Sequence, residues 1–160
     1  SRRGEIWVMN ADGSNLVRRT QTDSRSRSEA PAWSPDGSKI AFSSLRGGQF
    51  GIYVMSVDGD WANPTRVGYD RGYNTHPAWS PDGKKVAFNV RSGGFQIAAL
   101  DLAGGSTRIL GIGQNPVWGP DSRHLIFTEG GALYMLDTVS SRKNKLLDGL
   151  GKITEPSWSR

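Results

Sequence analysis

Short runs in which apolar and polar side chains alternate, separated by turn-forming residues, fill most of the chain. Residues 39–43 (KIAFS), 51–55 (GIYVM) and 85–89 (KVAFN) are examples. A period of two is typical of β-strands, and no stretch places its apolar residues at the spacing of an amphipathic helix. The pattern therefore predicts an all-β protein with almost no helix.

The same runs recur along the chain in the same order. Three long matches are 31–44 (PAWSPDGSKIAFSS), 77–90 (PAWSPDGKKVAFNV) and 116–129 (PVWGPDSRHLIFTE), and a fourth begins at Pro156. Self-similarity at about 40 residues is typical of supersecondary units that bury their apolar faces by stacking on copies of themselves. We therefore expect function to belong to a surface assembled from several repeats.

Each repeat contains two predicted hairpins. The first turns at Pro-Asp-Gly in residues 35–37 and 81–83, because proline presets φ and glycine accepts a positive φ, whereas the third repeat has Ser122 in place of the glycine. The second hairpin starts with strands at 5–9, 51–55, 96–100 and 132–136. Four short antiparallel strands per repeat predict the blades of a β-propeller, with the repeated tryptophans filling the space between blades.

Two segments identify the propeller type. The sequence PAWSPDGSKIAFSS followed by GIYVMSVDG resembles the WD40-like repeat of the TolB family, and EIWVMNADGSNLVRRT resembles its second half. The resemblance covers nearly the whole chain and implies four-stranded antiparallel blades, three of them complete. The expected units are a part-blade at 3–20, blades at 31–67, 77–110 and 116–147, and the first strand of another blade at 154–159.

Catalytic and metal-binding motifs are missing from the sequence. There is no G-x-S-x-G, H-E-x-x-H or Walker-type loop, and the absence of cysteine excludes disulfides and thiolate metal sites. His124 occupies the position of Lys39 and Lys85, which favours an exposed polar site over a catalytic one. The Asp-Gly pairs lack the alternating ligands of a calcium loop. We therefore predict a non-enzyme without cofactor or metal.

The formal net charge of +5 raises the question of nucleic-acid binding, because arginine clusters near residues 18–27 and basic residues near 142–145. These charges are scattered over turns, however, and no aromatic and basic residues are spaced along one strand as a binding platform. No apolar run approaches the length of a membrane span. We therefore predict no nucleic-acid partner and no direct membrane insertion.

One variable position stands beside an invariant motif. His76 directly precedes Pro77 and corresponds to Ala30, Asn115 and Glu155 in the other repeats. The first strands of a propeller line its channel, so we expect these residues at the channel rim, where a scaffold would hold a tunable surface. Ordinary tolerance of loops to substitution is the alternative.

Two loops enlarge the expected rim, residues 21–29 and residues 68–74 (GYDRGYN). The second loop carries Tyr69, Arg71 and Tyr73, and tyrosine and arginine are frequent interface anchors. The predicted partner-binding residues are Arg71, Tyr73, Asn74, His76, Gln114, Asn115 and Glu155.

The TolB resemblance also implies a function. It implies a non-enzymatic, periplasmic protein-binding scaffold of the Tol-Pal cell-envelope system that binds a peptidoglycan-associated lipoprotein at the channel mouth. Similar repeats form the gating propeller of prolyl-oligopeptidase-type serine peptidases, which is the main alternative, and a free-standing sensory or carbohydrate-binding propeller is a third. Because the end blades lack strands, we also expect the isolated chain to self-associate or to be marginally stable.

Overall fold

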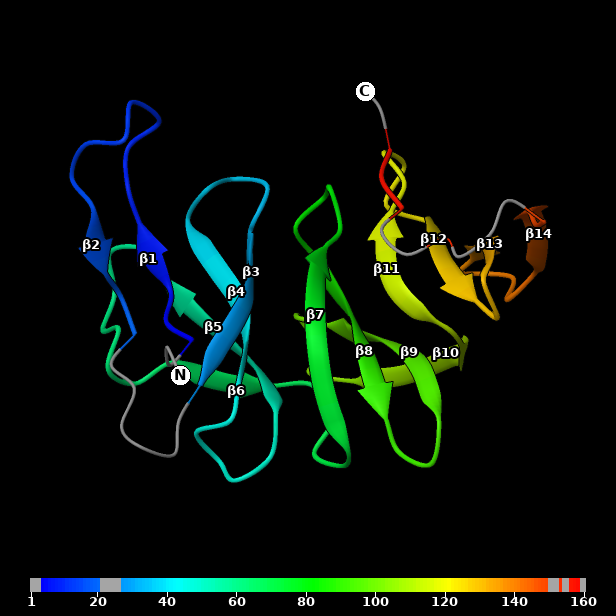
Figure 1. The fold of residues 1–160 in the computed structure, drawn as a ribbon, viewed down its shortest axis with the longest axis horizontal. Coiled ribbons are helices and arrows are strands. Elements are labelled where there is room, and N and C mark those ends of the chain that lie inside the picture. The colour runs from blue at the N-terminus through cyan, green and yellow to red at the C-terminus, as the bar shows by residue number, and fades with distance from the viewer. Residues whose placement is uncertain (1–3, 21–26, 150–152, 154–155, 159–160) are drawn as a thin grey trace.

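The computed structural model describes residues 4–20, 27–149, 153 and 156–158, and Figure 1 shows their fold. The described residues form one two-stranded and three four-stranded antiparallel sheets and contain no helix. Since they contain no helix, they contain none long and apolar enough to cross a bilayer. The prediction of an all-β fold built from four-stranded antiparallel blades is confirmed.

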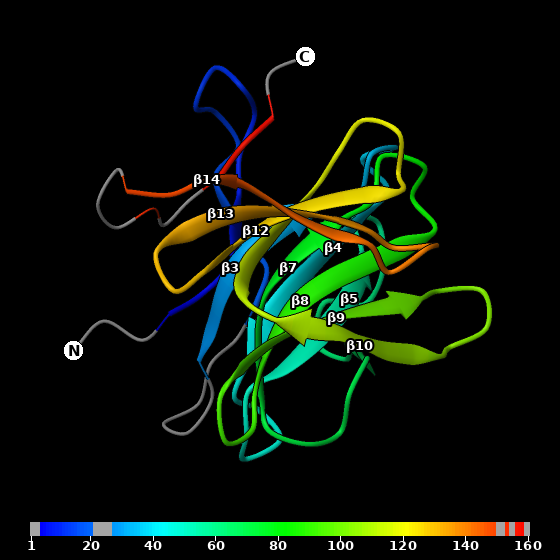
Figure 2. The same cartoon turned by 90° about the vertical axis from the view of Figure 1, so that its right-hand side faces the viewer.

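The strands follow one another in chain order within every sheet. The two-stranded sheet consists of β1 (Trp7–Val8) and β2 (Val17–Arg18). Blade 1 consists of β3 (Ser28–Trp33), β4 (Lys39–Ser44), β5 (Gly51–Ser56) and β6 (Thr65–Val67). Blade 2 consists of β7 (Tyr73–Trp79), β8 (Lys85–Arg91), β9 (Phe95–Asp101) and β10 (Thr107–Ile112). Blade 3 consists of β11 (Gln114–Trp118), β12 (His124–Glu129), β13 (Ala132–Asp137) and β14 (Lys143–Leu147). Figure 2, turned to look along the row, shows the twisted blades one behind another.

The first strand of each blade begins before its proline, earlier than the predicted blade starts at 31, 77 and 116. Strand β7, for example, begins at Tyr73, and the register with its neighbour shifts between Thr75 and Ala78. Equivalent shifts occur in β3 and β11. A proline at such a bulge has no ladder hydrogen bond to lose, so it interrupts the strand without ending it.

Two predicted end segments lie partly outside the described residues. Residue 3 of the first part-blade and residues 154, 155 and 159 of the last strand are not described. Residues 156–158, which are described, are not in a strand.

The hydrophobic cores lie between neighbouring sheets. Phe42, Phe88 and Phe127 occupy the same place in the three repeats, and all three are fully or almost fully buried. Phe88 packs with Ile52 of blade 1, and Phe127 packs with Ile97 of blade 2. Each blade therefore completes its core with a side chain from its neighbour, as stacked repeats require.

The repeated tryptophans tie the blades together. The indole N–H of Trp79 donates to the backbone oxygen of Ala32 at 3.1 Å, and that of Trp118 donates to Ala78 at 3.1 Å. In both cases the acceptor belongs to the first strand of the preceding blade. These two tryptophans therefore lie between blades, as predicted, and each satisfies its polar atom there.

Candidate functional site

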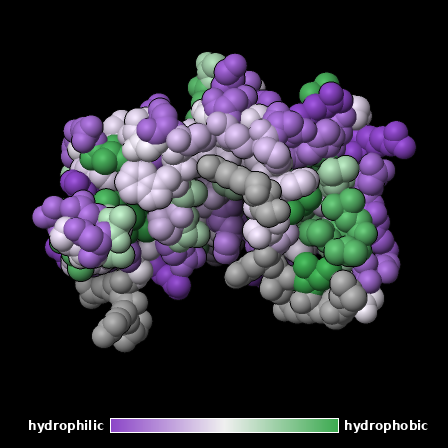
Figure 3. Space-filling view, turned by 90° about the horizontal axis from the view of Figure 1, so that it is seen from above, coloured by the Kyte–Doolittle hydropathy of each residue, from purple (hydrophilic) through white to green (hydrophobic). Residues whose placement is uncertain are grey.

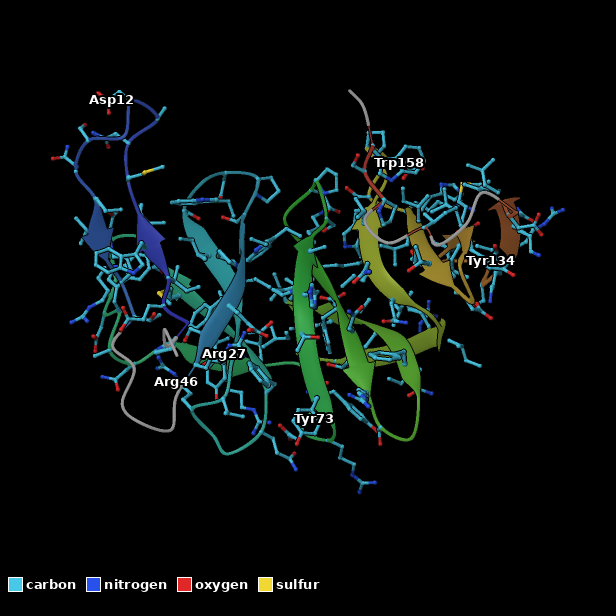
Figure 4. All side chains as sticks on the ribbon, viewed as in Figure 1. Asp12, Arg27, Arg46, Tyr73, Tyr134 and Trp158 are labelled. Carbon is cyan, nitrogen blue, oxygen red and sulfur yellow. The ribbon has the colours of Figure 1, made fainter. Side chains whose placement is uncertain are left out.

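Every blade has two chemically different ends. The turns that follow first and third strands lie at one end, here called the Asp-turn face: residues 34–38, 57–64, 80–84, 102–106, 119–123 and 138–142. The turns after second strands and the links between blades lie at the other end, here called the loop face: residues 45–50, 68–72, 92–94, 113 and 130–131. The turns that follow β3 and β7 are at the top of Figure 1, and Figure 4 places Tyr73 near the bottom, on the loop face.

Carboxylates on the Asp-turn face are engaged by their own turns. Asp36 accepts hydrogen bonds from the Ser34 hydroxyl at 2.6 Å and the Ser38 backbone N–H at 3.0 Å. These bonds, led by that of Ser34, lower the pKa of Asp36 to about 2. Asp82 repeats both bonds with Ser80 and Lys84. The aspartates therefore shape the turns, and the described residues contain no cluster of three or more potential metal ligands.

His124 also belongs to the Asp-turn face. Its Nδ1 lies 2.5 Å from Oδ2 of Asp121, three residues earlier. The Asp121 carboxylate is hydrogen-bonded first by the backbone N–H of His124, which with the other contacts lowers the pKa of Asp121 to about 2. The imidazole thus closes a turn on the surface.

The first strands of the three blades together line a hollow of about 340 Å³. Ala30, His76 and Asn115 lie in its wall, each followed by a lining proline, so the structure brings the predicted His76 and Asn115 together. All three have a left-handed backbone, with φ of 51°, 54° and 55°. This conformation is uncommon for residues other than glycine and often occurs at functional sites.

A repeated hydrogen bond holds two of these left-handed residues. The backbone N–H of His76 donates to the Ser43 hydroxyl at 3.1 Å, and the backbone N–H of Asn115 donates to Oδ1 of Asn89 at 2.8 Å. Ser43 and Asn89 occupy the same place in the second strands of successive blades. Because the main chain supplies the donor, the wall position keeps its geometry whichever side chain it carries.

The remaining predicted residues have different roles. Arg71 and Tyr73 are exposed on the loop face, and Gln114 is partly exposed. Asn74, in contrast, is fully buried, and its side-chain amide donates to the backbone oxygen of Tyr69. Asn74 therefore holds the 68–72 link in place and presents no surface of its own. Glu155 and residues 21–26 lie outside the described residues.

Sequence reasoning missed two exposed neighbours of Tyr73. Arg91 ends β8 directly opposite Tyr73, and Phe95 begins β9 directly opposite Arg91. The guanidinium carbon of Arg91 lies 5.3 Å from the centre of the Phe95 ring, within cation–π range. Pairing the predicted second and third strands across the short turn at 92–94 would have placed Arg91 opposite Phe95.

Comparison with known proteins gives a family for this geometry. The sequence matches the TolB beta propeller domain over residues 1–160. TolB from Acinetobacter baumannii has a TM-score of 0.79 at 24% identity, over 94% of this chain and 39% of its own. The putative TolB from Agrobacterium tumefaciens has a TM-score of 0.76 at 23% identity, over 93% of this chain and 58% of its own. A puromycin-hydrolyzing peptidase from Mycobacterium tuberculosis has a TM-score of 0.66 at 17% identity, over 84% of this chain and 22% of its own. The chain thus spans less than two thirds of each of these proteins.

Proposed function

The chain belongs to the TolB beta propeller family, and on this basis we propose that it is a protein-binding scaffold without catalytic activity of its own. In this proposal it is a periplasmic part of the Tol-Pal cell-envelope system. Its partner is a peptidoglycan-associated lipoprotein, which docks on the loop face over the channel.

The main support is the channel wall. Three blades present Ala30, His76 and Asn115 in one left-handed conformation around one hollow, although the three side chains differ in size and polarity. A rigid main chain carrying different side chains is what recognition of an irregular protein surface needs, because binding residues are commonly held by a rigid scaffold. Such a wall has no need of a reactive group.

The proposed contact residues are the predicted ones that reach the surface. Arg71 and Tyr73 would contact the partner at the loop face, and His76, Gln114 and Asn115 would contact it at the channel. Glu155 holds the equivalent repeat position and stays in the proposed set. Asn74 would contribute indirectly by supporting the 68–72 link.

Isothermal titration of the lipoprotein's soluble domain into the full-length protein tests this proposal. Tyr73→Ala and His76→Ala are each expected to weaken binding by about 1–2 kcal/mol, more than most interface contacts and less than a hot spot. Lys84→Ala on the Asp-turn face is the matched control and should bind as the unmodified protein does. Normal binding by the Tyr73 and His76 variants, with loss of binding in Lys84→Ala, would place the partner on the Asp-turn face.

The second candidate is a gating propeller of a serine peptidase. It is supported by the fold similarity to the M. tuberculosis peptidase, at lower identity and TM-score than the two TolB structures. A G-x-S-x-G hydrolase domain encoded downstream in the full-length gene would favour it, whereas a small α/β domain upstream would favour the scaffold.

We also infer that the isolated 160-residue chain self-associates. Large apolar side chains are exposed near both ends of the row of blades: Trp7, Met9, Leu16 and Trp33 at one end, Val139, Leu146, Leu147 and Trp158 at the other. Figure 3 shows hydrophobic side chains gathering at the blade 3 end. Exposed apolar patches and unpaired strand edges recruit other chains. Light scattering that finds a stable monomer at micromolar concentration would contradict this inference.

A further inference from the structure

Tyr73, Arg91 and Phe95 form a row across three strands at the loop-face end of blade 2, here called the aromatic–arginine row. Tyr73 pairs with Arg91 and Arg91 with Phe95, and directly opposite residues of antiparallel strands point to the same side of a sheet. Half of Tyr73 and 41% of Phe95 remain exposed. The row therefore presents one cation, supported by an aromatic ring, beside a second exposed aromatic ring.

The charges around the row are unbalanced. The loop face of blades 1 and 2 carries Arg27, Arg46, Arg71 and Arg91, whereas its described carboxylates are Glu29 and Asp70. Among the described residues, Arg27 is paired with Glu29 at 2.7 Å, and Arg46 donates to a backbone oxygen at 3.3 Å.

Arg71 and Arg91, in contrast, are exposed and make no ion pair within the described part of the chain. Two guanidinium groups are thus free to receive an acidic ligand.

We propose that the aromatic–arginine row, together with Arg71, is the anchor for a folded protein partner whose contacting surface carries carboxylates. This rests on the proposed function and names the chemistry that the partner must present. Arginine and tyrosine are enriched among the residues that dominate interface energies, and guanidinium binds carboxylate through two parallel hydrogen bonds.

An apolar neighbour favours a protein over a nucleic acid as the occupant. Ile112 is 63% exposed, and it pairs with Gln96, the residue after Phe95, so it lies at the same loop-face tip of blade 2 but on the other side of the sheet from the row. The tip of blade 2 is therefore apolar on both sides of the sheet, aromatic on the side of the cation and aliphatic on the other. Protein partners bury such surface at the centre of an interface, whereas the phosphate backbone of a nucleic acid contributes charge and sugar there.

Binding kinetics of the full-length protein with the lipoprotein's soluble domain test the proposal. Arg91→Gln should weaken binding at least tenfold at about 50 mM salt, mainly by speeding dissociation, and the effect should shrink as salt is raised. Arg91→Lys keeps the charge but loses the two parallel hydrogen bonds of a guanidinium group. Its affinity should therefore lie between those of the unmodified protein and Arg91→Gln. Lys84→Gln on the opposite face removes the same charge and should stay within twofold. An Arg91→Gln protein that behaves like Lys84→Gln would overturn the proposal.

Two further probes separate this inference from the proposed function. If the lipoprotein domain does not bind the unmodified protein at all, the proposed function fails. A twelve-residue glutamate-rich peptide then tests the row directly. Binding that is lost in Arg91→Gln and kept in Lys84→Gln supports an acidic protein ligand, and absence of binding overturns it. A thymidine oligonucleotide of twenty nucleotides is the second probe. If it binds more tightly than the peptide and this binding is lost in Arg91→Gln, the choice of a protein partner is overturned.

Discussion

The Asp-turn face and the loop face are built by the same repeats but differ in how their polar groups are used. On the Asp-turn face the carboxylates of Asp36, Asp60, Asp82 and Asp121 are bonded within their own turns, as Asp36 is to Ser34 and Ser38. On the loop face Arg71 and Arg91 are exposed and make no ion pair among the described residues. One face therefore uses these carboxylates for folding, whereas the other leaves two guanidinium groups exposed, as the proposed partner site requires.

This difference explains why the repeated sequence is so uneven. The Pro-Asp-Gly turn is nearly the same in two repeats because its side chains make structural bonds in each. The wall position of Ala30, His76 and Asn115 varies because its structural bond comes from the backbone N–H, at least in blades 2 and 3. Variation at a fixed geometry is what the proposed recognition surface would need.

The largest effect on stability is expected beside the Asp-turn face, at a tryptophan between two blades. Trp118 is 5% exposed and donates to Ala78 of blade 2. Trp118→Ala should destabilise the protein by about 3–5 kcal/mol, as for other large buried aromatics. Trp33→Ala at the same repeat position is the control, because Trp33 is half exposed and should cost clearly less. Urea unfolding of both variants measures the difference in free energy of unfolding. Equal losses of stability would show that burial of the tryptophan does not determine its contribution.

A smaller effect is expected where the third turn departs from the repeat. Ser122 replaces the turn glycine with a positive φ of 57°, and its hydroxyl accepts a hydrogen bond from the backbone N–H of Asp82 at 2.9 Å. Ser122→Ala should cost about 1 kcal/mol, because it keeps the backbone strain and loses the bond between blades. Ser122→Gly should cost less, since glycine relieves the strain while losing the same bond. Thermal melts that rank the two variants in the opposite order would contradict this account.

Much of this scaffold was predictable from the sequence, and the reason is local. The alternating runs and Pro-Asp-Gly turns depend on nearby residues, so the four strands of each repeat and the positive φ of Gly37 and Gly83 follow from short segments. The strand starts were less predictable. Pro77 suggests a strand beginning, but the bulge that accommodates it depends on pairing with β8.

The candidate site was only partly predictable for a similar reason. His76 and Asn115 could be paired by repeat position, but nothing local shows that Asn74 is buried by the 68–72 link. The alignment of Arg91 and Phe95 with Tyr73 likewise depends on register across three strands. Side-chain exposure at strand ends is a property of tertiary packing, which a single sequence does not encode locally.

Acid should weaken the Asp-turn face. The pKa of Asp36 and of Asp121 is lowered from 3.8 to about 2 in the folded protein, first by the Ser34 hydroxyl and by the His124 backbone N–H respectively. A lowered pKa means that the ionised carboxylate favours the folded state. Its contribution is present above pH 3.8 and is lost as pH falls through about 2.

Melting temperatures measured between pH 5 and pH 2 check this, at about half-unit steps. The unmodified protein should lose stability across this window, and an Asp36→Asn, Asp121→Asn double variant should lose less. Parallel curves for the two proteins would show that other groups cause the acid sensitivity. Both carboxylates are largely exposed, so only the direction and the pH window are predicted.

The smallest effect on stability is expected at the channel wall. His76→Ala should leave the free energy of unfolding within about 0.5 kcal/mol, the range of surface substitutions. Ala30 adopts the same left-handed conformation in blade 1, with φ of 51° against 54° for His76, so alanine is accommodated there. The bond to the Ser43 hydroxyl is also kept, because the backbone N–H of residue 76 donates it. Ser43→Ala is the variant for comparison, because it removes that buried acceptor and should lower the free energy of unfolding by about 1–3 kcal/mol. Urea unfolding that finds His76→Ala as damaging as Ser43→Ala would mean that the imidazole itself holds the wall, and the division between a fixed main chain and free side chains would then fail at its central residue.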